Sequence, residues 1–108
     1  MKDNKIYLKH IQDSILQIEK YLDKVEYLEF KNKQMLLDAV VRQLEIIGEA
    51  TNNLSSGFRE KYSDIYYRDI VDMRNFLIHE YFGIDPKIVW DTCKHDLPNL
   101  KNEIENIL

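Results

Sequence analysis

Apolar residues recur every three or four positions through most of this 108-residue chain, and this spacing restricts the fold to packed helices. The first such segment runs from near Asn4 to the middle twenties. Its apolar stripe consists of Ile11, Ile15, Ile18, Leu22 and Val25. The sequence has three glycines and two prolines, and no segment alternates apolar and polar residues as a half-buried strand would. We therefore predict an all-α protein.

The rest of the chain divides into a second long helix, a short piece, a third helix and a last helix. Their predicted limits are Asn32 or Lys33 to Asn53 or Leu54, Phe58 to Ile65, Tyr66 to Tyr81, and Asp85 to Leu108. Gly83 is a plausible stop for the third helix, and Asp85 followed by Pro86 is typical of a helix start. Pro98 lacks the N–H that a helix interior needs, so the last helix should bend or divide there. The pattern predicts a bundle of four to five helices in a single domain, residues 1–108.

Composition and charge restrict the class of protein further. A hydrophobic content of 44% argues against disorder, and a net charge of -4 gives no support for coating nucleic acid, although a local basic cleft is still allowed. The single cysteine, Cys93, fits a reducing compartment. Met1 leads into charged residues rather than a signal peptide, and no apolar run approaches the roughly 20 residues that span a bilayer. We expect a soluble, cytoplasmic protein.

The second helix has an unusually wide apolar face. Counted at about 100° per residue, its apolar side chains cover about 240° of arc, which is more than one neighbouring helix can bury. A homodimer interface would cover the surplus. The alternative is that this is the central helix, packed by all the others. Gly48, which is costly inside a helix, would permit a close crossing with another helix.

Arg74 lies in the middle of the apolar arc of the third helix, where a leucine would be expected. The arc is formed by Tyr66, Tyr67, Ile70, Val71, Met73, Leu77, Ile78 and Tyr81. A guanidinium cannot lose its charge, so this position requires an acidic partner, a bound anion or a wet cleft.

The polar stripe of the second helix offers acidic partners. Glu45 and Glu49 lie one turn apart, so both could face one cleft and pair with Arg74 or orient His79. They could equally be solvated or salt-bridged structural acids. A di-metal site is not favoured, because the Glu-x-x-His spacing is absent and the three histidines lie on three predicted helices without ligand spacing. We predict no metal and no cofactor.

Arg74, His79 and Tyr81 match the R-x4-H-x-Y signature of the HEPN superfamily, and the surrounding sequence resembles its HepT-like branch. The similar segments occur in the same order and spacing, over roughly residues 33 to 100. They are Arg42–Ala50, Met73-Arg74-Asn75, Ile78-His79-Glu80-Tyr81-Phe82, Val89-Trp90 and Asp96-Leu97-Pro98.

This resemblance implies a HEPN-like helical bundle that works as a homodimer and cleaves RNA as a metal-independent endoribonuclease toxin. Arg74 and His79 would be catalytic, and Asn75 would position the backbone or His79. The partner would be a minimal nucleotidyltransferase antitoxin, which in resembling systems attaches AMP to the motif tyrosine, here Tyr81. The alternative is a non-catalytic helical dimer that binds a nucleotidyltransferase or nucleotides.

The chemistry expected of such a site is simple. RNA carries its own nucleophile, the 2′-hydroxyl, so cleavage needs a proton acceptor, a proton donor and a cation for the developing phosphorane charge. A histidine, with an ordinary pKa of about 6.5, can serve as acid or base, and an arginine can hold two phosphate oxygens. In an unbroken helix, however, His79 points about 140° away from Arg74. Either the helix loosens near His79, or the working pair comes from opposite subunits.

Overall fold

The computed structural model describes residues 3–80 and 83–108, and in these residues the chain forms helices and no strands. The long helices are α1 (Asn4–Leu22), α3 (Gln34–Asn52), α5 (Tyr67–His79) and α7 (Leu97–Ile107). Shorter helices are α2 (Tyr27–Lys31), α4 (Ser56–Lys61) and α6 (Pro86–Asp91), and a π-helical turn, η1 (Thr92–Asp96), joins α6 to α7. The all-α prediction is confirmed.

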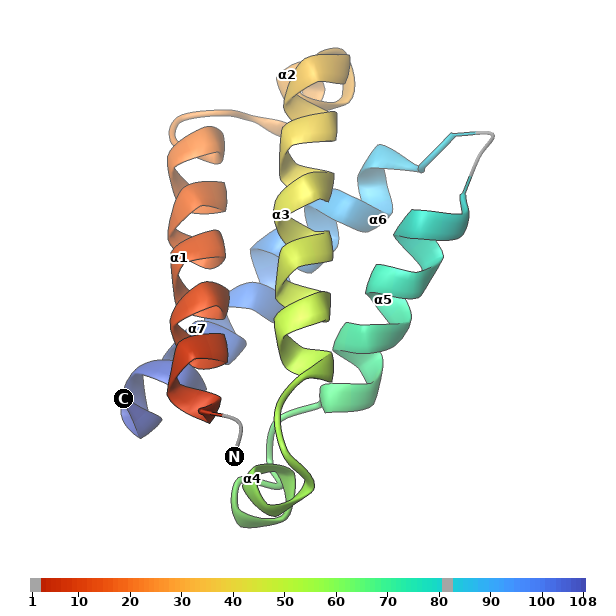
Figure 1. The fold of residues 1–108 in the computed structure, drawn as a ribbon. Helices are drawn as coiled ribbons and strands as arrows, with labels where there is room; N and C mark the ends of the chain where they lie inside the picture. Colours follow the sequence, from red (N-terminus) through yellow and green to blue (C-terminus); the bar gives the residue numbers. More distant parts are fainter. Residues whose placement is uncertain (1–2, 81–82) are drawn as a thin grey trace.

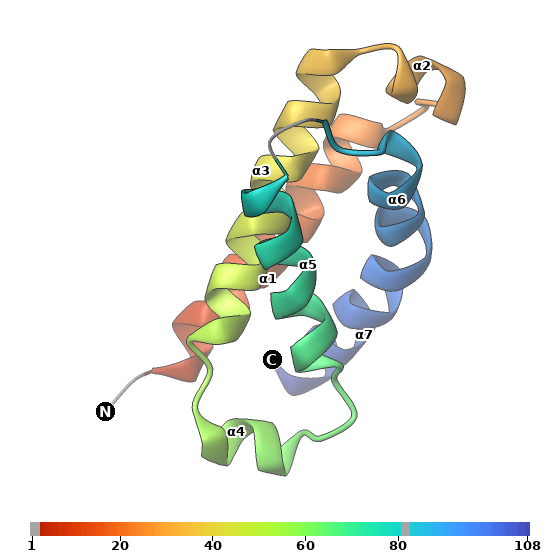
Figure 2. The same cartoon turned by 90° about the vertical axis from the view of Figure 1, so that its right-hand side faces the viewer.

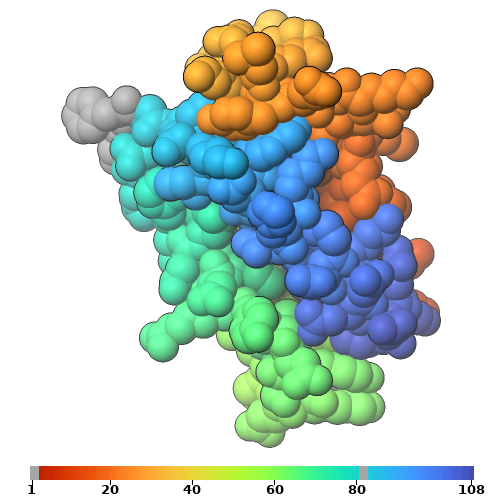
Figure 3. Space-filling model, turned by 180° about the vertical axis from the view of Figure 1, so that it is seen from behind, coloured from red at the N-terminus to blue at the C-terminus, as the bar shows by residue number. Residues whose placement is uncertain are grey.

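Helix α3 stands at the centre of the molecule. It packs against α1 on one side and α5 on the other, and these three helices lie side by side in Figure 1. Helix α2 lies at one end of α3 and α4 at the other, whereas α6 and α7 cross behind, as the turned view in Figure 2 shows. Seen from behind, α6 and α7 cover much of the molecule between α2 and α4 (Figure 3).

The core forms where the apolar stripes of these helices meet. Four of the five residues predicted for the first stripe are buried, each at most 6% exposed: Ile11, Ile15, Ile18 and Leu22. The fifth, Val25, is partly buried beyond the end of α1. Burial of these side chains is the main favourable contribution to folding, at about 1.5–3 kcal/mol for each fully buried residue.

Most of the wide apolar arc of α3 is buried within the single chain. Its buried members are Leu37, Val40, Val41, Leu44, Ile47, Gly48 and Ala50. Met35, which is 87% exposed, is the large apolar side chain that α3 leaves in solvent. The alternative prediction, that this is the central helix, is confirmed, because α1 and α5 pack on two sides of α3 and α2 and α6 also contact it. The dimer stays a prediction, and it needs other support.

Local signals placed most of the helix ends correctly. Asp85 caps α6 through a side-chain oxygen that accepts from the Lys87 N–H, and Pro86 occupies the first turn. The chain is π-helical just before Pro98, and the Leu97 N–H donates to the Thr92 carbonyl. A proline removes one helical donor and crowds the preceding turn, so a change of helix type there accommodates it. The predicted interruption is therefore a π-helical turn between α6 and α7.

Helix α2 was not predicted. Five residues are too few to show a 3.6-residue period, and so short a helix is not stable alone. Tertiary packing holds it, because Phe30 is fully buried and its ring lies 5.3 Å from that of Trp90 on α6.

Across the two described ranges, no helix has both the length and the apolar character that crossing a membrane would need.

Candidate functional site

The candidate site begins at the crossing of α3 and α5. A Cβ built on Gly48 would lie 2.2 Å from the Arg74 Cβ and 2.7 Å from its Cγ. No side chain larger than hydrogen fits there without moving one of the two helices. The predicted close crossing at Gly48 is confirmed, and the helix that crosses α3 there is α5, which carries Arg74 and His79.

Arg74 has the acidic partner that its position requires. Its Nη2 donates to a carboxylate oxygen of Glu49, and its Nη1 donates to the side-chain oxygen of Asn75 at 2.7 Å. The Nε–H is buried and has no hydrogen-bond partner in the described part of the chain. The Arg74 side chain is 19% exposed, whereas that of Glu49 is 62% exposed. The ion pair therefore joins a largely buried guanidinium to a carboxylate that remains exposed to solvent.

A groove of about 310 Å³ opens beside this ion pair, between α1, α3 and α5. Its polar lining residues are Tyr7, His10, Arg42, Glu45, Glu49, Asn53 and Arg74. Glu45 and Glu49 share this groove, as one of the two predicted interpretations required. Ile46 and Ile78 supply apolar lining. The arrangement combines a wet cleft with two guanidinium groups, which suits an anionic ligand that can displace a carboxylate.

His79 lies elsewhere. It is exposed and is the last residue of α5, which runs unbroken from Tyr67 to His79. The five-residue step therefore keeps its rotation of about 140°, and His79 is not among the residues that line the groove. No loosening of the helix brings Arg74 and His79 together in one chain.

Two of the three predicted supporting residues bind Arg74. Glu49 and Asn75 both bind the guanidinium, and neither forms a hydrogen bond with His79. Glu45 lines the groove without a hydrogen bond among the described residues. Tyr81, the predicted modification site, lies outside the described residues.

Sequence reasoning missed His10. This histidine lies on α1, far from the motif in sequence, and the structure places it in the Arg74 groove together with Tyr7. Its ring meets that of Tyr7 edge-on, with centroids 6.4 Å apart. The helical period shows which face of α1 is polar, but not which polar residues of that face adjoin α3 and α5.

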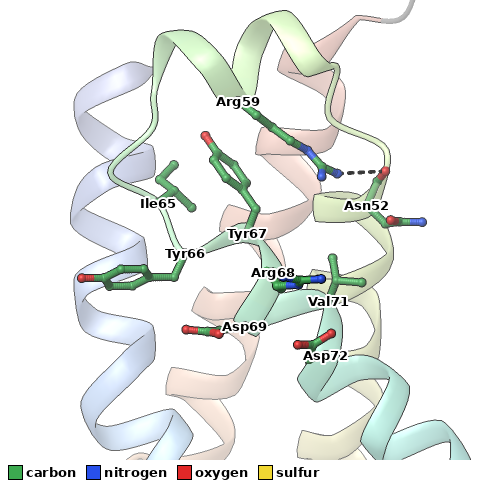
Figure 4. A pocket seen from close by; sticks show the side chains of 9 residues that line it. All are labelled: Asn52, Arg59, Ile65, Tyr66, Tyr67, Arg68, Asp69, Val71 and Asp72. Carbon is green, nitrogen blue, oxygen red and sulfur yellow. Dashed lines mark hydrogen bonds between the residues drawn. The ribbon is translucent and has the colours of Figure 1, made fainter.

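A larger hollow of about 560 Å³ lies where α4 leads into α5, away from Arg74 (Figure 4). Arg59 lines this hollow, and its Nη2 donates to the carbonyl oxygens of Thr51 and Asn52 at the end of α3. The guanidinium carbon also lies 5.5 Å from the centre of the Tyr67 ring. Arg59 is thus a C-terminal cap of α3, since cations near the last helical carbonyls are favourable. None of the predicted site residues that the structure describes line this hollow.

Two other possible kinds of site find little support. In residues 3–80 and 83–108, no group of three or more His, Cys, Asp or Glu residues is placed to hold a metal ion. Cys93 is buried, and burial raises the pKa of its thiol to about 12. A thiol that stays protonated at neutral pH is a poor nucleophile, so the groove at Arg74 is the better candidate.

Comparison with known proteins agrees with the sequence motif. Residues 11–107 match the family described as Ribonuclease HepT-like. The chain belongs to this family, the HepT-like branch of the HEPN superfamily, and the resemblance predicted from its sequence is confirmed. No solved structure matches the chain.

Three relatives illustrate the similarity. "Gamma-glutamylcyclotransferase and putative RNase MJ0434" of Methanocaldococcus jannaschii is 49% identical over 99% of this chain, which spans 48% of that protein. "Putative RNase MJ1380" of the same organism is 40% identical over 96% of this chain and 95% of its own length. "Probable ribonuclease HepT" of Thermococcus cleftensis is 37% identical over 98% of this chain and 96% of its own length.

Proposed function

We propose that this protein is a metal-independent endoribonuclease that acts as the toxin of a toxin–antitoxin pair. The observation that carries the proposal is Arg74, a guanidinium held at a tight helix crossing and open to a groove, in a member of a ribonuclease family. The names of its relatives point to the same activity, since several are described as ribonucleases.

Cleavage would proceed by attack of the RNA 2′-oxygen on the adjacent phosphorus. A base removes the proton of the 2′-hydroxyl, the bond from phosphorus to the 5′-oxygen breaks, and an acid protonates the leaving oxygen. The products are a 2′,3′-cyclic phosphate and a free 5′-hydroxyl. Arg74 would exchange Glu49 for phosphate oxygens and stabilise the charge that develops on them, and His79 would transfer a proton.

The rotation between Arg74 and His79 supports a homodimer in which Arg74 of one subunit works with His79 of the other. Ile78, which is 42% exposed, and partly buried Ile46 both line the groove. Exposed apolar side chains at the mouth of a polar groove suit a two-fold contact that brings the grooves of the two subunits into one open cleft.

Control would come from a minimal nucleotidyltransferase antitoxin that transfers AMP to Tyr81. A phosphodiester on that tyrosine adds an anion and bulk two residues beyond His79, where both would oppose RNA binding.

One observation favours a second candidate function. The Arg74–Glu49 ion pair joins α5 to α3, and such a pair can serve only to hold two helices together. A non-catalytic helical dimer that binds a nucleotidyltransferase or nucleotides would have no need of His79.

Expression of the wild-type chain alone, beside Arg74→Ala and His79→Ala variants, tests the proposal. The endoribonuclease predicts growth arrest and RNA cleavage by the wild type and loss of both in each variant. RNA left intact by the purified, folded wild-type protein would favour the binding module.

A further inference from the structure

His10 is the histidine that shares a groove with Arg74 in the single chain. It extends from α1, is exposed, and makes no hydrogen bond or ion pair within the described part of the chain. The Tyr7 ring lies edge-on to the imidazole. An exposed imidazole with no partner among the described residues, in a groove that two arginines also line, is free to bind a ligand.

The charged groups that line the groove balance one another when His10 is left out. The charged groups that line the groove are Arg42, Glu45 and Glu49 from α3 and Arg74 from α5, and Tyr7 is the other titratable group on α1. Two guanidinium groups and two carboxylates cancel formally. A protonated His10 would therefore give the groove a net positive charge, and a neutral His10 would leave it without one.

We propose that His10 and Arg42 bind a backbone phosphate of RNA next to the phosphate held by Arg74. The inference rests on the proposed function, because it extends the groove at Arg74 into a track for a polyanion. Imidazolium and guanidinium groups both donate hydrogen bonds to phosphate oxygens and need no acceptor in return. Arg42 is exposed on the same face of α3 as Glu45 and Glu49, so a strand that enters at Arg74 can continue along α3 toward Arg42.

Binding of an RNA that cannot be cleaved separates this subsite from catalysis. The probe is a fluorescent single-stranded oligonucleotide with 2′-O-methyl groups, which removes the nucleophile and leaves the phosphates in place. Its dissociation constant is measured by anisotropy at about pH 5.5 and about pH 8, on either side of the ordinary histidine pKa of about 6.5. The proteins are the wild type, His10→Gln, Arg42→Gln and the matched control His95→Gln, whose imidazole is exposed outside the groove.

The wild type should bind more tightly at the lower pH. His10→Gln should remove about a two- to fivefold part of this gain, as expected for one exposed ionic contact, and His95→Gln should keep it. Arg42→Gln should weaken binding at both pH values and reduce the slope of log K against log salt by about 0.7, the loss of one phosphate contact on a single strand. Thermal melting should be unchanged in all three variants, because the substituted side chains are exposed.

Three results would overturn the subsite: His10→Gln and His95→Gln with the same pH dependence, Arg42→Gln with wild-type affinity, or no binding of the probe by the wild type. Cleavage of ordinary RNA is scored separately. If His10→Gln loses pH-dependent binding while the wild type cleaves nothing, the subsite stands and the ribonuclease function fails. If the wild type cleaves RNA and His10→Gln binds the probe normally, the function stands and the subsite fails.

Discussion

Gly48 and Arg74 meet where α3 crosses α5, so closely that a Cβ on the glycine would lie 2.2 Å from the Cβ of the arginine. The glycine thereby places the guanidinium beside Glu49, one residue further along α3. A position that determines how two helices pack also determines where the candidate catalytic cation lies.

Gly48→Ala should destabilise the protein, although alanine is the better helix former. The added methyl group would overlap the stem of Arg74, and overpacking of this kind costs about 1–3 kcal/mol, against a gain of up to about 1 kcal/mol from helix propensity. Urea unfolding measures the difference. The matched control is Gly57→Ala in α4, where a Cβ has nothing within 4 Å and should be neutral or slightly stabilising. A Gly48→Ala protein as stable as Gly57→Ala would contradict the tight crossing.

Arg74→Ala and His79→Ala should each reduce RNA cleavage by about 100-fold or more, if charge stabilisation and proton transfer have ordinary size. A mixture of the two inactive variants distinguishes the arrangements of the pair. If Arg74 works with His79 of the other subunit, each mixed dimer regains one intact site, and activity returns. If both act within one subunit, each site in the mixed dimer lacks a residue and activity stays lost. Full activity of His79→Ala would end its assignment as a catalytic residue.

Cleavage should survive EDTA and should leave a 2′,3′-cyclic phosphate or the 3′-phosphate that its hydrolysis produces. The reason is that the 2′-hydroxyl of RNA replaces the water that a metal ion would otherwise activate. Mass spectrometry of the products of a defined oligonucleotide, with and without the chelator, makes the measurement. Loss of activity in EDTA and its return with a divalent ion would overturn the metal-free mechanism.

The protein should be a two-fold homodimer at micromolar concentration, and Ile78→Lys should weaken it. A lysine at the proposed contact would replace apolar surface with a charge that must lose water when the subunits meet. Ile88→Lys is the matched control, because Ile88 is also 42% exposed but lies on α6, outside the groove. Light scattering measures the mass of each protein. A monomeric wild type, or equal effects of the two lysines, would count against this interface.

A nucleotidyltransferase partner supplied with ATP should transfer AMP to Tyr81 and abolish RNA cleavage. The modification adds a phosphate anion close to the candidate catalytic residues in sequence, and like charges repel the RNA backbone. Mass spectrometry of the Tyr81 peptide after co-expression detects the adduct, and Tyr81→Phe is the control. If no AMP is found and Tyr81→Phe is still neutralised, the antitoxin acts by covering the groove.

The sequence alone determined the helical fold and the need of Arg74 for a partner. The stripe from Ile11 to Leu22 and the Asp85-Pro86 cap are local signals, since each depends on residues within one turn or on one helical face. A charge in the middle of an apolar arc is a local contradiction that only a cleft or an acid can resolve, and both Glu49 and the groove do so. These features could be predicted because they do not depend on which other helix packs against them.

Tertiary structure decided which faces meet. Most of the apolar arc of α3 is buried against other helices of the same chain. Helix α2 exists because Phe30 packs against Trp90, and His10 shares a groove with Arg74 although the two residues lie far apart in the sequence. Helical periodicity gives the direction of each side chain about its own axis. It does not give the rotation and crossing angle of one helix against another. These depend on how closely residues such as Gly48 and Arg74 allow the two helices to approach.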